Sequence, residues 1–205
     1  MRCRKGPEVT VSPLAAAVWG AFALLTSPAV LGAVLAAAAL HELGHYAALR
    51  LCGGRLRSLR LTPLGALMVP EDTSRLSYGA ELAVTLAGPA VNGAMTLLLG
   101  LLGRLWPAAY VFAGAQAVLG AFNLLPARGL DGGRALWLAA AWCTEPFTAD
   151  RVARAVGLAT ALAVFAAGAA LCLYTRGSPF LLLGGAGMVI SWAREKGLVK
   201  PAATG

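Results

Sequence analysis

Two histidines and a glutamate stand close together in the segment His41-Glu42-Leu43-Gly44-His45, and these are the only two histidines among the 205 residues. On a helix, residues four positions apart share one face, so both imidazoles can bind one metal ion. Glu42 is positioned to exchange a proton with a water molecule that the ion activates. This is the HExxH arrangement, in which neutral imidazoles bind zinc. The alternative is a chance pattern on an ordinary helix.

The sequence around the motif is typical of a membrane helix. Residues 36–40, directly before it, are all apolar, and an ionisable group at membrane depth is costly unless it has a partner or a function. Hydrophobic residues make up 59% of the chain and charged residues 13%, with a mean hydropathy of +0.72. An ordinary soluble domain is about one quarter charged. The setting therefore favours a functional metal site in a lipid bilayer.

Apolar runs separated by proline, glycine and polar residues predict an all-α polytopic membrane protein, organised as one domain over residues 1–205. We expect six transmembrane helices, at about residues 14–25, 29–52, 78–102, 108–125, 152–174 and 180–192. A cleaved signal peptide is the alternative for the first of these, because a basic segment precedes it. After the second helix, residues 55–70 predict a small membrane-associated β-hairpin, with a plain basic loop as the alternative. Gly88-Pro89 is expected to loosen the third helix.

Basic residues indicate which side of the membrane each loop occupies. All 17 lysines and arginines except Arg104 and Arg176 lie in the N-terminal head, the segments 50–75 and 128–154, and the C-terminal tail. The positive-inside rule then makes the chain a multi-pass cell-membrane protein with both termini in the cytoplasm and the motif nearer the cytoplasmic face. This topology explains the net charge of +8, so no nucleic-acid partner is expected.

A hydrolytic zinc ion needs three protein ligands and one open position. Without a third histidine, the remaining ligand must be a carboxylate or a thiolate. The four cysteines show no CxxC spacing and are predicted to be small packing residues. Asp131 is the best candidate, since it follows a membrane helix in a glycine-rich turn, whereas most other acidic residues lie in polar loops or tails. Its alternative role is that of a turn aspartate.

Three motifs in order carry a resemblance to a known family: HELGH in the second helix, AGPAVN in the third and NLLPxxxLDGG after the fourth. The chain resembles the site-2 protease family of intramembrane zinc metalloproteases, peptidase M50. The order HELGH, basic strand, LTPLG, LAGP, FNLLP, LDGG is similar to the bacterial stage IV sporulation protease branch. The resemblance implies one Zn²⁺ held by His41, His45 and Asp131, with Glu42 as the general base. It implies cleavage of a membrane-associated protein substrate, such as a sporulation sigma-factor precursor, and a membrane-protein regulator as a further partner.

Two asparagines are candidates for contacts with the substrate. Asn123, and then Asn92, could bind substrate backbone or a developing oxyanion; the alternative is a helix-packing amide. Gly129 stands where the sporulation branch usually has proline, and we expect a looser turn before Asp131. Neither a CBS nor a PDZ domain is expected in these 205 residues. The alternative function is a catalytically inactive metal-binding scaffold or a transporter, although a transporter should show internal repeats.

Overall fold

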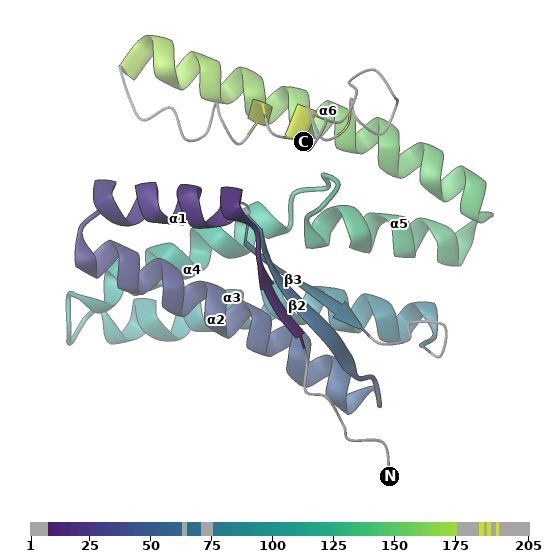
Figure 1. Ribbon diagram of the computed structural model, residues 1–205, viewed down its shortest axis with the longest axis horizontal. Helices are drawn as coiled ribbons and strands as arrows, with labels where there is room; N and C mark the ends of the chain where they lie inside the picture. The colour runs from purple at the N-terminus through teal and green to yellow at the C-terminus, as the bar shows by residue number, and fades with distance from the viewer. Residues whose placement is uncertain are drawn as a thin grey trace. The chain divides into compact units, whose positions relative to one another are not determined.

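The computed structural model describes residues 8–62, 65–70 and 76–175, together with residues 185, 186, 188, 189 and 192. The chain divides into two compact units, Met1–Asn123 and Leu124–Gly205. The first unit holds β1 (Glu8–Val11), α1 (Pro13–Leu25), α2 (Pro28–Leu51), β2 (Leu56–Thr62), β3 (Gly65–Pro70), α3 (Tyr78–Leu102) and α4 (Ala109–Asn123) (Figure 1). The second unit holds α5 (Asp131–Cys143) and α6 (Pro146–Thr175). The prediction of a single domain stays a prediction.

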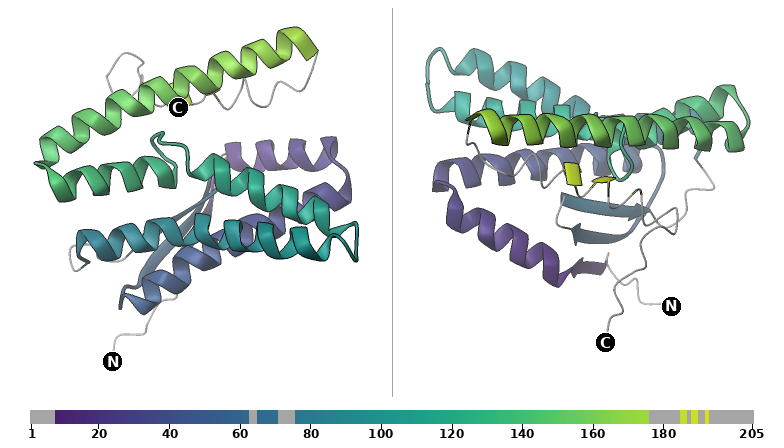
Figure 2. Two further views of the ribbon diagram at one scale, coloured as in Figure 1. Left: turned by 180° about the vertical axis from the view of Figure 1, so that it is seen from behind. Right: turned by 90° about the horizontal axis from the view of Figure 1, so that it is seen from above.

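Helices α2, α3 and α4 pack against one another and form the centre of the first unit (Figure 2). Small residues permit this packing. A Cβ atom added to Gly44 of α2 would lie 2.8 Å from the Ala87 carbonyl oxygen of α3, and one added to Gly120 of α4 would lie 2.9 Å from the Cβ of Asn92. Glycines at such positions let helix backbones approach closely within a membrane.

Local signals set both ends of α2, the helix that carries the motif. The Ser27 hydroxyl accepts a hydrogen bond from the Val30 N–H, and Pro28 occupies the first turn. At the other end, Gly53 has a φ of 78°, and the N–H groups of Gly53 and Gly54 donate to the carbonyls of Arg50 and Leu49. This is a Schellman motif, which ends a helix on a residue that readily adopts positive φ.

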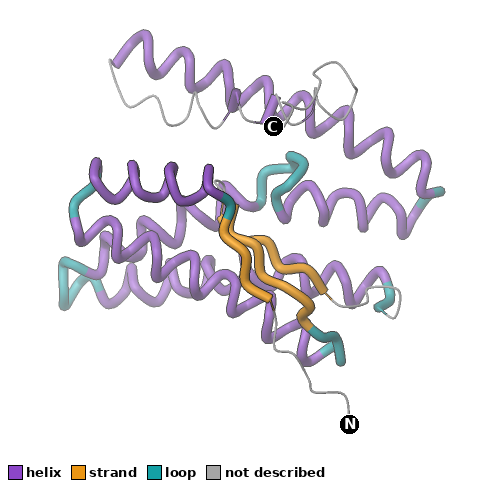
Figure 3. Tube along the Cα trace, in the orientation of Figure 1, coloured by secondary structure: helices purple, strands orange, loops and turns teal. Residues whose placement is uncertain are grey.

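The predicted hairpin is confirmed as part of a larger sheet (Figure 3). Strands β2 and β3 pair antiparallel, and β1 pairs parallel to the opposite edge of β2 in the order β1-β2-β3. We did not predict β1, because its four residues lie in the segment that we assigned to a basic head. Helix α1 packs against β2 and α2 packs against β3.

Three helices of the described residues are long and apolar enough to cross a membrane: Pro28–Leu51, Tyr78–Leu102 and Pro146–Tyr174. They indicate a multi-pass membrane protein. Helices α1 and α4 have only 13 and 15 residues, or about 20 Å at 1.5 Å per residue, against roughly 30 Å of hydrocarbon. The expected span at 180–192 lies largely outside the described residues. Six spans are therefore not confirmed.

Helix α3 continues through Gly88 and Pro89, and Pro89 has no N–H to donate to the preceding turn. Two other local expectations were wrong. Helix α6 begins at Pro146, six residues before the start of the span expected at 152–174, because residues 146–151 are also helical. Of the cysteines, Cys52 and Cys143 are exposed and do not act as packing residues.

Candidate metal centre

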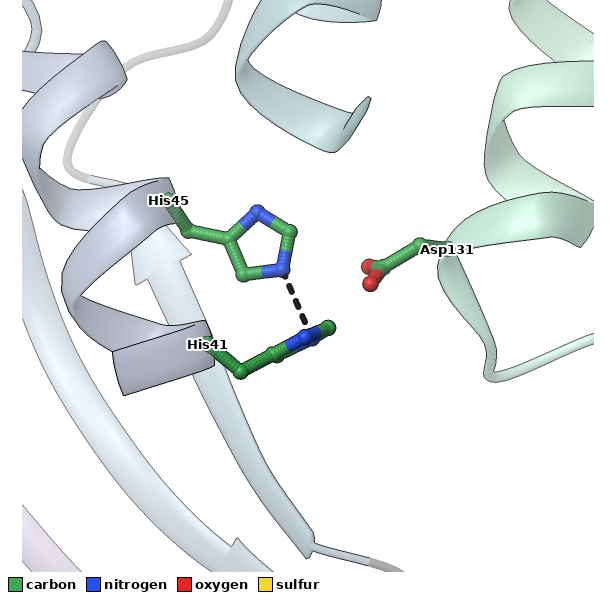
Figure 4. Close-up of side chains that lie close together, drawn as sticks. All are labelled: His41, His45 and Asp131. Atoms are coloured by element: carbon green, nitrogen blue, oxygen red, sulfur yellow. Dashed lines mark hydrogen bonds between the residues drawn. The ribbon is translucent and has the colours of Figure 1, made fainter. Parts of the chain in front are cut away.

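The two imidazoles of α2 point their Nε2 atoms toward one another (Figure 4). The Nε2 atoms of His41 and His45 lie 3.1 Å apart, with the ring planes at 85°. Two nitrogens that each lie 2.0–2.1 Å from one tetrahedral zinc ion would be about 3.3 Å apart. His41 is only 4% exposed. The spacing of the motif on a helix thus brings both ligand atoms to one point, as the sequence predicts.

The other nitrogen of each ring determines its tautomer. His45 Nδ1 lies 2.8 Å from the Val84 carbonyl oxygen, which can only accept, so Nδ1 carries the proton and donates. His41 Nδ1 donates in the same way to Oδ1 of Asn92. In the neutral rings, each Nε2 therefore has an unprotonated lone pair. Two lone pairs that face each other at 3.1 Å can both bind one metal ion, and the pair fits zinc for this reason.

Asn92 is fully buried, with an exposed fraction of 0%, and all its described side-chain bonds are to protein groups. Its Oδ1 accepts from His41, while its Nδ2 donates to Oε1 of Gln116 and, at 3.4 Å, to the Ala37 carbonyl oxygen. These contacts are those of a helix-packing amide. The bonds link α2, α3 and α4 within one unit.

Gln116 is a member of the site that sequence reasoning missed. It is 2% exposed and lies in the middle of α4. The signal was present, since Gln116 is a lone polar side chain in an otherwise apolar stretch of that helix, and polar groups at membrane depth mark functional or paired positions.

Gly88 of α3 lies directly against the His45 ring. A Cβ atom at this position would overlap the ring atoms Nε2, Cε1 and Cδ2. The glycine of the AGPAVN segment therefore leaves the space that the imidazole occupies. Glu42 directly follows His41 in α2 and is half-buried.

Asp131 belongs to the second unit and occupies the first turn of α5. A carboxylate is stabilised there by the partial positive charge at a helix N-terminus. The glycines around it serve backbone geometry: Cβ atoms at Gly132 and Gly133 would overlap carbonyl groups of residues 124–127, and Gly129 has a φ of 85°. Proline, whose φ is fixed near −65°, cannot adopt that conformation. The glycine at 129 thus marks a turn of different shape from one that proline would form.

Asn123 is the last residue of α4 and is half-buried. Its Nδ2 donates to the Leu119 carbonyl oxygen of the same helix at 3.1 Å. The amide group has a second N–H donor, and its role as a contact for substrate stays a prediction.

Comparisons with known proteins match this centre. The model of peptidase family M50 matches residues 29–113, which include the two histidines, Asn92 and the start of α4. A zinc metalloprotease of Methanocaldococcus jannaschii is 30% identical over 104 residues, which is 47% of this chain and 30% of the relative. The chain thus spans less than a third of that relative's length.

The fold has a solved counterpart. The structure of a site-2 protease from Methanocaldococcus jannaschii superimposes with a TM-score of 0.68 at 20% sequence identity, covering 100% of this chain and 99% of the other. At that identity the likeness concerns the fold. The chain is thus similar to peptidase family M50 over residues 29–113, and its fold is similar to that of a site-2 protease.

Proposed function

We propose that this protein is a zinc-dependent endopeptidase that cleaves a peptide bond within or next to a membrane segment of another protein. The observation that carries the proposal is the pair of imidazole Nε2 atoms 3.1 Å apart on a helix long and apolar enough to cross the bilayer. The similarity of residues 29–113 to peptidase family M50 supports the same activity.

We assign the third zinc ligand to Asp131. Nitrogen from imidazole and oxygen from carboxylate are both ordinary zinc ligands, and three protein ligands leave the fourth position for the reaction. Figure 4 draws the three side chains of this proposal. The glycines next to Asp131 support the assignment, because they allow the turn to bring the first residue of α5 close to other backbone.

Each residue of the proposed site then has a separate role in the reaction. When bound, zinc lowers the pKa of water toward about 7 and polarises the scissile carbonyl. Glu42 accepts the proton of the attacking water and returns it to the leaving amine nitrogen. The Nδ1–H groups of His41 and His45 donate to Asn92 and Val84, which leaves the Nε2 atoms to bind the metal. We assign the second N–H of Asn123 to the substrate backbone or the oxyanion.

The substrate must reach this centre in an extended form, because the peptide groups of a helix are already hydrogen-bonded. Among the described strands, β2 lies between β1 and β3, so β3 pairs with β2 on one side and has no strand on its other side. We propose that an unwound substrate adds as a strand along the outer edge of β3. The resemblance to the sporulation branch puts a sigma-factor precursor first among the substrates, ahead of an anti-sigma factor or a signal-peptide remnant.

A comparison of membrane proteomes tests the activity. Cells that express the wild-type protein should contain new protein N-termini in or beside membrane segments, and Glu42→Gln should remove them. The loss of general-base catalysis is expected to lower the rate by about 10²- to 10⁴-fold, whereas the zinc content of the purified variant should be unchanged. New N-termini that persist with Glu42→Gln would contradict the mechanism.

A second pair of variants tests the third ligand. Asp131→Asn should weaken zinc binding in a chelator competition, because a neutral amide replaces the carboxylate. Asp150→Asn is the matched control, since it makes the same change at a carboxylate of α6 that forms an ion pair with Arg154 at 3.1 Å. The two side chains of this pair are 37% and 38% exposed. Equal zinc affinity for the wild type and Asp131→Asn would contradict the assignment.

A further inference from the structure

None of the described hydrogen bonds joins Gln116 directly to His41 or His45. Gln116 is instead connected to His41 through the side chain of Asn92. Its Oε1 accepts from Nδ2 of Asn92, and Oδ1 of Asn92 accepts from Nδ1 of His41. We call this set of Gln116, Asn92 and His41 the amide relay. Its three members come from α4, α3 and α2 and are all buried, with exposed fractions of 2%, 0% and 4%.

The direction of the relay follows from the two acceptors around Nδ2 of Asn92, the backbone carbonyl of Ala37 and the side-chain oxygen of Gln116. An asparagine amide can turn by 180°, exchanging its oxygen and nitrogen. In Asn92, Nδ2 faces the Ala37 carbonyl oxygen and Oε1 of Gln116, both acceptors. If the Asn92 amide turned while Gln116 kept its orientation, the Asn92 oxygen would face two other oxygens. This orientation leaves Oδ1, an acceptor, as the group that faces His41.

The Ala37 carbonyl alone is a weak anchor, because its distance to Nδ2 is 3.4 Å, at the long end of hydrogen bonds. Gln116 therefore supplies the main reason why Asn92 presents oxygen to His41. Without Gln116, the Asn92 amide can turn and present N–H to Nδ1. His41 would then carry its proton on Nε2, the atom that faces His45, and the lone pair needed for a metal would be lost.

We propose that Gln116 is a positioning residue, which keeps the Nε2 lone pair of His41 available for the metal by fixing the orientation of Asn92. This inference rests on the proposed zinc site. The other ligand provides an internal contrast, because His45 donates to a backbone carbonyl, that of Val84, which no side-chain exchange removes. Loss of Gln116 should therefore weaken one of the two histidine ligands.

The test is the zinc affinity of purified full-length variants, measured by competition with a chelator of known affinity. Gln116→Met keeps the bulk of the side chain but removes the acceptor, and we expect zinc to bind about 10- to 100-fold more weakly, as for other groups that orient metal ligands. Gln116→Glu still places an oxygen against Nδ2 of Asn92, so its affinity should stay within about threefold of the wild type.

Thr96→Val is the matched control. The Thr96 hydroxyl donates to the backbone carbonyl of Asn92 at 2.8 Å, so this variant removes a hydrogen bond at the same residue without touching the relay. Its zinc affinity should equal that of the wild type. The thermal unfolding midpoint of each metal-free variant, measured in detergent, separates loss of the ligand from loss of the fold.

The outcomes distinguish the inference from the function on which it rests. If the wild type binds no zinc, the proposed function fails. If the wild type binds zinc and Gln116→Met binds it equally well, or if Thr96→Val weakens binding as much, only the positioning role is overturned. Should Gln116→Met not yield folded protein, Gln116→Asn, which is shorter by one methylene and withdraws the acceptor, takes its place under the same criteria.

Discussion

Gly88 determines how much room the His45 ring has beside α3. Any side chain at this position would overlap the imidazole, so the ring would have to leave the rotamer that directs Nε2 toward His41. We therefore expect a glycine outside the HExxH motif to be needed for metal binding at the proposed site. A protein interior tolerates few such displacements, because its side chains are close-packed.

We expect Gly88→Ala to lower zinc affinity by about tenfold or more, since groups that orient metal ligands have effects of 10- to 100-fold. Zinc content and chelator competition measure the effect. Gly93→Ala is the control in the same helix, because a Cβ atom there has nothing within 4 Å, and it should keep full affinity. If the two alanine variants bind zinc equally well, the ring does not depend on the space at Gly88.

The turn before α5 is a second place where backbone conformation matters more than side-chain chemistry. Gly129 has a φ of 85°, in the left-handed region. Asparagine enters that region more readily than alanine, and proline cannot enter it. The residue that the sporulation branch usually has here is therefore incompatible with the turn that this chain forms.

Replacement of Gly129 should lower the thermal unfolding midpoint in the order asparagine, alanine, proline. Alanine should cost about 1–2 kcal/mol because of its left-handed backbone, and Gly129→Pro should cost more and also weaken zinc binding through Asp131. Unfolding in detergent and chelator competition provide the two measurements. A Gly129→Pro variant as stable as the wild type would show that the turn can adopt another shape at no cost.

Local signals made two elements predictable almost to the residue. The second expected span, 29–52, corresponds to α2, because Ser27, Pro28 and Gly53 mark its ends in the sequence. The third, 78–102, has the bounds of α3. The alternation of residues 55–70 likewise predicted the hairpin of β2 and β3.

Features that depend on distant partners were not predictable. Strand β1 has four residues and pairs with a strand about fifty positions away, so nothing local distinguishes it from an extended loop. The motif predicted that His41 and His45 share a face, but not which groups bind their Nδ1 atoms. Gln116 could be recognised as a polar residue in an apolar helix, yet its partner depends on how α3 and α4 are rotated against each other, which a single sequence does not give.

For the whole molecule, the distribution of positive charge predicts how the chain lies across the bilayer. Cys52 is exposed just after α2, beside the arginine-rich segment. Leu105 is 87% exposed between α3 and α4. If the basic loops face the cytoplasm, these two positions lie on opposite sides of the membrane.

Labelling with a membrane-impermeant maleimide measures this arrangement. In a variant that keeps Cys52 as its sole cysteine, labelling should require permeabilised cells. In a cysteine-free variant that carries Leu105→Cys, intact cells should be labelled. The reverse pattern would place both termini and the metal centre on the outer side.

The two histidines also differ in whether a substitution can remove the hydrogen-bond partner of their Nδ1 atoms. The partner of His45 is the main chain at Val84, which every amino acid at that position supplies as long as the helix persists. The partner of His41 is a side chain, which a single nucleotide change can erase. In a saturation screen for metal loading, most substitutions at position 84 should therefore keep metal binding, whereas most substitutions at position 92 should weaken it. Natural variation that changes the metal affinity of the centre would then act through His41 and not through His45.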